Sequence, residues 1–382
     1  MSVHRPVKSE TLGLACAGLS LIAVCYGLAR FAYGLFVPVF RAEFGLDAAA
    51  TGAIASSAYV SYCLAIVAAT VLTPRLGGRA LAVLAGCAAT TGTLLIAVAP
   101  NATVLTAGVI VAGSSTGVAS PPLAHAVARA VAAPVRNRTQ TVVNAGTGVG
   151  VAVAGPIALL TYGQWRTGWF VFAVVCAAVT GWVARAVPAA RSAGGPAAPL
   201  PRPLLPAGSG RLVAAAALTG VASAATWTFG RDLLVTVGGM NQRPATLAWV
   251  LLGALGVLGA VAGDLAGRVG IGGAWLLTTS VLAAATGLLA AVPGEPAVAS
   301  VAAGAFGAAY IALTGLLLIW GTRVYPRTPA AGVGVAFLVL ALGQAAGASL
   351  VGAAAEAVGL RSAFAVAALV AALGAALRPH PR

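Results

Sequence analysis

The chain has 382 residues, of which 60 % are hydrophobic and only 8 % are charged. Because a soluble domain carries roughly 25 % charged residues, this composition excludes a protein whose whole surface faces water. The mean hydropathy of +0.98 therefore predicts an all-α membrane protein surrounded by lipid. Helices are expected rather than strands, because the apolar runs lack the alternating polar face of a barrel strand.

Long uncharged runs follow one another along the chain, beginning with an apolar stretch from Thr11 to Phe40. This stretch exceeds the apolar region of a signal peptide, roughly 7–15 residues, so we expect a retained first helix. A spanning helix needs about 20 apolar residues. Twelve segments of about this length are predicted, at 12–40, 49–73, 80–99, 103–128, 139–162, 167–187, 212–237, 245–267, 272–292, 297–321, 330–353 and 360–377.

The net charge of +15 could suggest a nucleic-acid partner, but the basic residues are sorted by side of the membrane. With the N-terminus in the cytoplasm, 16 of the 22 basic residues fall in cytoplasmic segments. The expected external loops hold Arg41, Arg166, Arg243 and Arg361. This positive-inside pattern predicts a multi-pass protein with both termini in the cytoplasm and no nucleic-acid partner. The single lysine beside 21 arginines suggests a bacterial source, hence the inner membrane.

Proline and glycine accumulate between Pro188 and Gly210. No helix persists through so many breakers, so we expect a flexible cytoplasmic linker over 188–210. This linker divides the chain into an N-terminal six-helix bundle, residues 1–187, and a C-terminal six-helix bundle, residues 211–382.

A short motif recurs at the cytoplasmic end of the second span in each half. Residues 70–77 read TVLTPRLG and residues 263–270, which begin at Gly263, read GDLAGRVG. The shared positions are Leu72, Arg75 and Gly77 in the first copy, and Leu265, Arg268 and Gly270 in the second. The copies lie about half the chain apart, which predicts two duplicated, pseudo-symmetric halves.

This motif resembles the loop motif between helices 2 and 3 of the major facilitator superfamily. Gly155-Pro156 in the fifth span, preceded by glycines within 146–150, is similar to a Gly-Pro motif of that superfamily's exporters. Residues 26–33, with the sequence Arg-Phe-Ala-Tyr at their end, and residues 343–347 resemble a poorly characterised bacterial branch of the same superfamily.

The resemblance implies a monomeric secondary active transporter that works by alternating access, in which two six-helix halves rock around a midplane site. The Gly-Pro motif implies efflux of the substrate. Two departures limit the comparison. Pro74 and Gly267 replace the motif's aspartate, so the cytoplasmic gate must close by other contacts. Val109 stands where the superfamily's fourth span carries an arginine, so that residue's proton-coupling role is not carried over.

Ionisable groups within spans are costly and usually face a cavity. Arg30 and Arg231 are therefore expected to line the substrate cavity from the two halves, with an interfacial or ion-pair role as the alternative. Asp232 is the only acid well inside an expected span. It is the candidate proton carrier, or else the permanent ion-pair partner of a cationic neighbour.

Polar and aromatic side chains in the spans complete the candidate cavity, with helix packing or anchoring at the bilayer interface as the alternative for each. They are Tyr33, Tyr62, Asn144, Trp227, Tyr310 and Gln344.

Glycines at four-residue steps predict smooth helix faces that let backbones approach closely. One such face carries Gly259, Gly263 and Gly267, and a second carries Gly343 and Gly347. These faces serve either static packing or sliding between the halves.

An embedded enzyme would need clustered metal ligands or a nucleophile with its base. The chain has three histidines and no such motif, so we expect no enzymatic activity, cofactor or metal. The expected partners are the lipid bilayer, an unidentified small molecule and protons. A non-transporting receptor or scaffold built on a transporter fold is the alternative that sequence leaves open.

Overall fold

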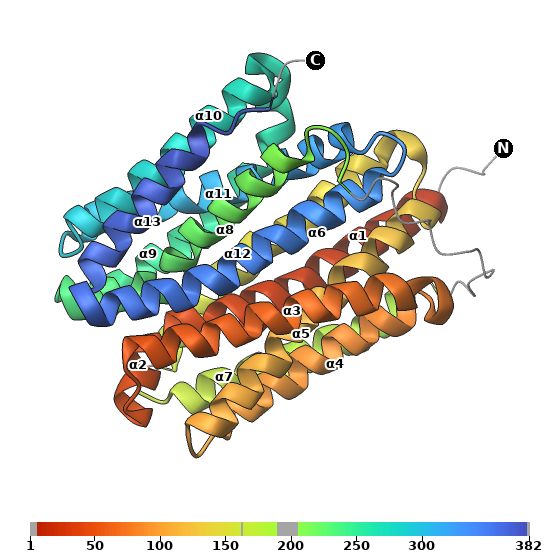
Figure 1. The fold of residues 1–382 in the computed structure, drawn as a ribbon. Coiled ribbons are helices and arrows are strands. Elements are labelled where there is room, and N and C mark those ends of the chain that lie inside the picture. The colour runs from red at the N-terminus through yellow and green to blue at the C-terminus, as the bar shows by residue number, and fades with distance from the viewer. Residues whose placement is uncertain (1–5, 162, 189–204, 380–382) are drawn as a thin grey trace. The chain divides into compact units, whose positions relative to one another are not determined.

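A computed structural model describes residues 6–161, 163–188 and 205–379. All regular structure in these residues is helical, as the composition predicts (Figure 1). The predicted linker 188–210 lies for the most part outside the described residues.

The first half of the sequence forms five long helices after a composite first span. This span consists of α1 (Pro6–Ile22), the π-helical segment η1 (Ala23–Phe31) and α2 (Ala32–Phe44), which follow one another without a break. The later helices are α3 (Ala48–Leu76), α4 (Gly78–Ala97), α5 (Ala102–Ala130), α6 (Ala133–Leu160) and α7 (Trp165–Ala186).

The second half follows the same order. Its first span consists of α8 (Ser209–Asp232) and the π-helical segment η2 (Leu233–Val237). The remaining elements are α9 (Gln242–Gly256), the 3-10 segment η3 (Val257–Val261), α10 (Ala262–Ala291), α11 (Pro296–Val324), α12 (Pro329–Val358) and α13 (Leu360–Ala375).

Ten helices in the described part of the chain are long and apolar enough to cross a membrane, so the expected twelve are not all reproduced. One of the ten, Gln242–Ala291, has 50 residues and covers two expected spans. At about 1.5 Å per residue it would be about 75 Å long, more than twice the roughly 30 Å hydrocarbon core. It bends at Gly270, where φ is 74°. The last helix, Leu360–Ala375, has 16 residues and is shorter than the ten.

Both copies of the sequence motif end in the same backbone bend. Gly77 has φ 88° and ψ 154°, and Gly270 has φ 74° and ψ 158°. Glycine is the residue that adopts such positive φ values without a steric penalty. This agreement, 193 residues apart, supports the predicted duplication.

Two further glycine pairs follow the same rule. Gly45 and Gly239, with φ 62° and 63°, lie after the first span of each half. Gly163 and Gly359, with φ 81° and 84°, lie after the fifth span of each half. The corners of the two halves therefore correspond, as expected of a duplicated chain.

By its internal contacts the chain separates into two compact units. The N-terminal unit comprises residues 1–32 and 61–197, and the C-terminal unit comprises residues 33–60 and 198–382. Residues 33–60 thus belong with the second half of the sequence. The division into bundles 1–187 and 211–382 stays a prediction.

Each unit is built on a small set of helix pairs. In the N-terminal unit α4 packs against α5 and α7, and α6 packs against α1 and η1. In the C-terminal unit α8 packs against α12 and α13, and α11 packs against α9, α10 and α12.

Glycines make the crossing of the first and fifth spans very close in the N-terminal unit. A Cβ atom added at Gly150 of α6 would overlap the backbone of Ala23 in η1. One added at Gly27 of η1 would overlap the backbone of Gly150. The two backbones therefore touch directly, as small residues at membrane helix interfaces allow.

The C-terminal unit repeats this crossing between α8 and α12. Added Cβ atoms at Gly343 and Gly347 would meet backbone atoms of Ala217 and Val221 in α8. The expected glycine face of α12 is thus a packed interface.

The other expected glycine face behaves differently. An added Cβ at Gly259 would meet the backbone of Ala312 in α11, whereas Gly263 and Gly267 have nothing within 4 Å. Only one of these three glycines is needed for close packing.

We expect Gly150→Val to destabilise the protein, because the new side chain would force α6 away from η1. Overpacking of this kind costs about 1–3 kcal/mol. The matched control Gly263→Val places the same side chain in open space. The midpoint of thermal unfolding in detergent should fall for Gly150→Val and stay near wild type for Gly263→Val. Equal midpoints would contradict the close crossing.

Candidate functional site

In the N-terminal unit, Arg30 lies in a cage of aromatic rings. Its guanidinium carbon is 4.6 Å from the ring centre of Tyr62, 5.0 Å from that of Phe31 and 5.8 Å from that of Tyr26. Arg30 is only 7 % exposed. Cation–π attraction strengthens when the cation is removed from water. The structure thus brings together the predicted residues Arg30 and Tyr62.

The cage is fixed from outside by a hydrogen bond between hydroxyl groups. The Tyr26 hydroxyl lies 2.9 Å from Oγ of Ser120 in α5. Arg30 itself is carried by the π-helical segment η1. Such segments are rare and are frequently found at functional sites. The second π-helical segment, η2, begins directly after Asp232.

In the C-terminal unit, Trp227 is the centre of a second aromatic cluster. Its ring lies 5.3 Å from Tyr310, 5.8 Å from Phe306 and 6.1 Å from Trp249, between ring centres and in edge-on geometry. Nε2 of Gln344 donates a hydrogen bond of 2.9 Å to the Tyr310 hydroxyl. The predicted residues Trp227, Tyr310 and Gln344 are therefore in one buried cluster.

Arg231 ties three helices of the C-terminal unit together. Its guanidinium donates a 2.8 Å hydrogen bond to the backbone carbonyl of Leu35 in α2 and another bond to Oε1 of Gln242 in α9. It is 6 % exposed. Tyr33, which lies close to Leu35 in the sequence, donates a hydrogen bond from its hydroxyl to the backbone carbonyl of Thr51 in α3. These contacts connect Arg231 and Tyr33 to neighbouring helices, and the expected cavity role of both residues stays a prediction.

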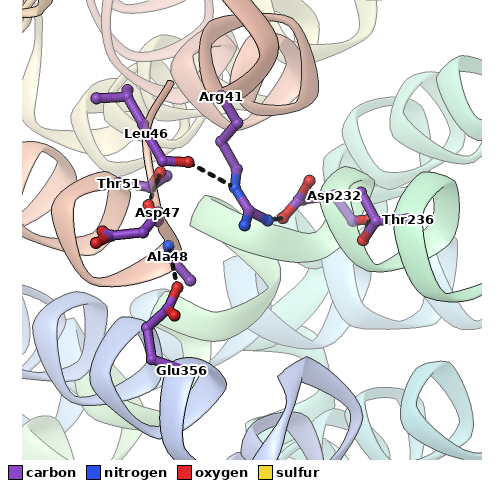
Figure 2. Close-up of polar contacts among 8 residues, drawn as sticks. All are labelled: Arg41, Leu46, Asp47, Ala48, Thr51, Asp232, Thr236 and Glu356. Carbon is purple, nitrogen blue, oxygen red and sulfur yellow. Dashed lines mark hydrogen bonds and ion pairs between the residues drawn. The ribbon is translucent and has the colours of Figure 1, made fainter. Parts of the chain in front are cut away.

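Asp232 forms an ion pair with Arg41 (Figure 2). The Asp232 side chain is fully buried, whereas that of Arg41 is 28 % exposed. Nε of Arg41 also donates to the backbone carbonyl of Leu46, at 3.3 Å. Figure 2 shows the guanidinium bridging the α2–α3 turn and α8. Arg41 is thus the cationic neighbour that the sequence left open for Asp232.

A second carboxylate of the C-terminal unit contacts the same turn. Oε1 of Glu356, near the end of α12, accepts a hydrogen bond of 2.6 Å from the backbone nitrogen of Ala48, the first residue of α3 (Figure 2). Backbone nitrogens at a helix start lack partners within the helix and attract anions. Glu356 therefore caps α3 from another helix.

The two contacts border a cavity of about 550 Å³. Its charged or hydroxyl-bearing lining residues are Arg41, Asp232, Thr236 and Glu356, and the rest of the lining is apolar. We call it the outer cavity, because the charge pattern predicts that this end faces outward. Its volume lies within the range of small-molecule sites, about 300–1,000 Å³. The buried Oδ1 atom of Asp232 has no hydrogen-bond partner in the described structure.

The remaining predicted residues lie apart from these clusters. Asn144 is exposed on α6, where it accepts a hydrogen bond from Gln140 of the same helix. Leu72 is half-buried, and Arg75 and Arg268 are exposed near the two glycine bends. In α6, Gly155 is buried and Pro156 is exposed. No contact described here gives these residues a role at a site, and a shared cavity for Arg30 and Arg231 stays a prediction.

The sequence analysis did not predict a role for Arg41 or Glu356. These residues make the two polar contacts at the outer cavity, from Arg41 to Asp232 and from Glu356 to Ala48. Arg41 did carry a signal, because it is one of only four basic residues in the expected external loops. A basic residue against the positive-inside trend calls for a local reason, and here that reason is Asp232. Trp249, Phe306 and Gln242 were missed without any such signal.

The apolar helices define a multi-pass membrane protein. The family model described as "Major Facilitator Superfamily" matches residues 19–348. The chain therefore belongs to the major facilitator superfamily, a superfamily of transport proteins, as its motifs indicated.

Solved structures show the same fold at low sequence identity. The nucleoside transporter NupG is 13 % identical with a TM-score of 0.76, over 96 % of this chain and 98 % of that chain. A bacterial homolog of the human lysosomal transporter Spinster, inward-facing and occupied, is 15 % identical with a TM-score of 0.77, over 98 % and 96 % of the two chains. Its unoccupied form is similar, with 16 % identity and a TM-score of 0.74. The search of curated proteins found no match.

We expect a double-mutant cycle to reveal strong coupling between Arg41 and Asp232. Arg41→Gln leaves a buried carboxylate without its cation, which costs on the order of 3 kcal/mol. Asp232→Asn on that background removes the unpaired charge and should restore much of the loss. Thermal unfolding followed by tryptophan fluorescence measures all four proteins. Additive effects would show that the pair contributes little.

Proposed function

We propose that the chain is a secondary active transporter of a bacterial inner membrane, with twelve spans and both termini in the cytoplasm. It acts as a monomer and exports a small molecule by alternating access, with protons as the coupling ion. The observation that carries this proposal is the pair of polar contacts at the outer cavity, from Asp232 to Arg41 and from Glu356 to Ala48.

These two contacts have the properties expected of a gate in a transporter. They join residues 41–48 to α8 and α12, and all of these residues lie in the C-terminal unit although 41–48 come from the first half of the sequence. Alternating access requires contacts at each end of the protein that form in one state and break in the other. Two carboxylate contacts beside an open cavity can break without dismantling the close backbone crossing of α8 and α12.

Asp232 is the proposed proton carrier. Protonation would remove the negative charge of its carboxyl group, and with it the attraction to Arg41. The tie between α2 and α8 would then weaken, which would couple proton uptake to opening of the outer end. The Asp232 side chain is fully buried and belongs to the lining of the outer cavity, which supports this proposal.

The two aromatic clusters are the proposed substrate contacts. Each presents large apolar rings with a few polar groups, namely Arg30 and Tyr62 in one unit, and Trp227, Tyr310 and Gln344 in the other. Sites for small molecules typically have this composition. Outward direction is supported by the Gly155-Pro156 motif of α6 alone. NupG is a nucleoside transporter by name, so nucleosides belong in the first substrate panel.

Everted membrane vesicles test the transport proposal. Vesicles from cells that produce the protein are energised to an acidic interior, which acridine orange reports. A panel of nucleosides, amines and organic acids is then added. We expect at least one compound class to dissipate the proton gradient only when the protein is present. Asp232→Asn should reduce this proton flux at least tenfold, because the amide does not carry a proton at neutral pH.

The matched control is Glu295→Gln, which neutralises an exposed acid at the start of α11, away from the outer cavity. It should retain the wild-type flux. Proton flux that persists in Asp232→Asn would remove Asp232 as the carrier. Ligand binding without flux for any compound would instead fit a receptor or scaffold.

A further inference from the structure

The outer cavity carries a charge balance that points to its ligand. Its charged lining residues are Arg41, Asp232 and Glu356, which sum to one negative charge. Apolar residues such as Pro38, Leu46 and Leu360 form most of the remaining wall. A cavity of about 550 Å³ with this lining fits an organic molecule that carries one positive charge on an apolar body.

Asp232 has unused capacity to accept hydrogen bonds. A carboxylate offers about four acceptor positions on two oxygens. In the described structure the Arg41 guanidinium bonds to Oδ2, and Oδ1 is buried with no hydrogen-bond partner. A buried polar atom without a partner is unfavourable, because it has lost its hydrogen bonds to water without replacing them. A ligand that donates to Oδ1 would remove this penalty.

The contacts of Arg41 would allow its guanidinium to leave Asp232. The Asp232 side chain is fully buried and that of Arg41 is 28 % exposed, so Arg41 is the more accessible partner of the pair. The separate bond from its Nε atom to the Leu46 carbonyl would keep the side chain near the α2–α3 turn after release. The partly exposed Glu356 carboxylate, which uses Oε1 for Ala48, provides a second anion at the same cavity.

From these observations we infer that the outer cavity is a binding site for an organic monocation, a protonated amine with an apolar body. Its ammonium group displaces the guanidinium of Arg41 and bonds to Asp232, with Glu356 as the second anion. Arg41 is then an internal competitor that occupies the site in the absence of ligand. The inference goes beyond the proposed transport function, because it assigns a ligand class to the outer cavity, which is separate from the aromatic clusters proposed as substrate contacts.

The alternative occupant is an inorganic cation. Among the described residues no group of three or more acidic, cysteine or histidine side chains is placed to hold a metal ion. The mainly apolar wall would give a hydrated ion few partners. An organic cation uses both the charge and the wall.

Binding of 2-phenylethylammonium to the full chain in lipid nanodiscs tests the inference. Isothermal titration calorimetry, with empty nanodiscs as the blank, gives the dissociation constant. The neutral analogue 2-phenylethanol has the same apolar body and should bind at least tenfold more weakly. Asp232→Asn should weaken ammonium binding at least tenfold, and Glu295→Gln should leave it within twofold of wild type.

Arg41→Gln separates competition from a purely structural role. If Arg41 competes for Asp232, its removal should tighten ammonium binding at least threefold, whereas a merely supporting residue would weaken it. Arg166→Gln, at an exposed arginine of the N-terminal unit, is the matched control and should change nothing. If Arg41→Gln does not fold, Ala355→Phe fills the cavity without altering charge, and should weaken binding at least tenfold.

Several results would overturn the site. They are equal binding of the ammonium and the alcohol, unchanged affinity in both Asp232→Asn and Ala355→Phe, or no binding to wild type at millimolar concentration. Unchanged or weaker binding in folded Arg41→Gln would remove the competition. If vesicles show Asp232-dependent proton flux but the ammonium does not bind, this inference fails and the proposed function stands. Binding without flux gives the reverse result.

Discussion

Lipid as solvent is the constraint from which the rest of the structure follows. With only 8 % charged residues, the chain must satisfy its backbone groups internally, and in the described residues it does so with helices alone. Apolar side chains do not sort one helix interface from another in lipid. Close packing between helix surfaces, rather than hydrophobicity, therefore determines which helices pair. Direct backbone contact at the crossings of η1 with α6 and of α8 with α12 is the clearest expression of this rule.

Against this apolar background, the three ionisable side chains expected within the spans have three different environments. Arg30 is surrounded by aromatic faces, Arg231 bonds to a backbone carbonyl and an amide, and Asp232 bonds to Arg41. The three environments differ in chemistry. Arg30 and Arg231 are held by uncharged groups, whereas Asp232 is held by a second charged group. The proposed proton coupling and cation binding both use this charged pair at the outer cavity.

The sequence predicted those features that depend on constraints within a short segment of the chain. Hydropathy predicted the helices because lipid imposes a minimum apolar length. The recurrence of Gly77 and Gly270 predicted a duplication, and both glycines adopt the positive φ that other residues resist. Tertiary pairing was beyond reach, since Arg41 and Asp232 are 191 residues apart with no shared motif. Asn144 is exposed, and its expected place in a cavity stays a prediction, because one polar residue in a glycine-rich helix does not reveal which face lines a cavity. Helix length alone does not give the expected twelve spans, because the helix Gln242–Ala291 continues through a bend and covers two of them.

The matched glycine corners have a consequence for how the two halves diverged. Gly45, Gly77 and Gly163 have counterparts in Gly239, Gly270 and Gly359 with nearly the same φ values. A corner of this kind tolerates few substitutions, so a duplicated chain would keep its path at these glycines while its side chains changed. In the N-terminal half Arg30 lies among aromatic rings, whereas in the C-terminal half Arg231 is followed by the acid Asp232. Two halves with matching corners thus hold two unlike chemistries.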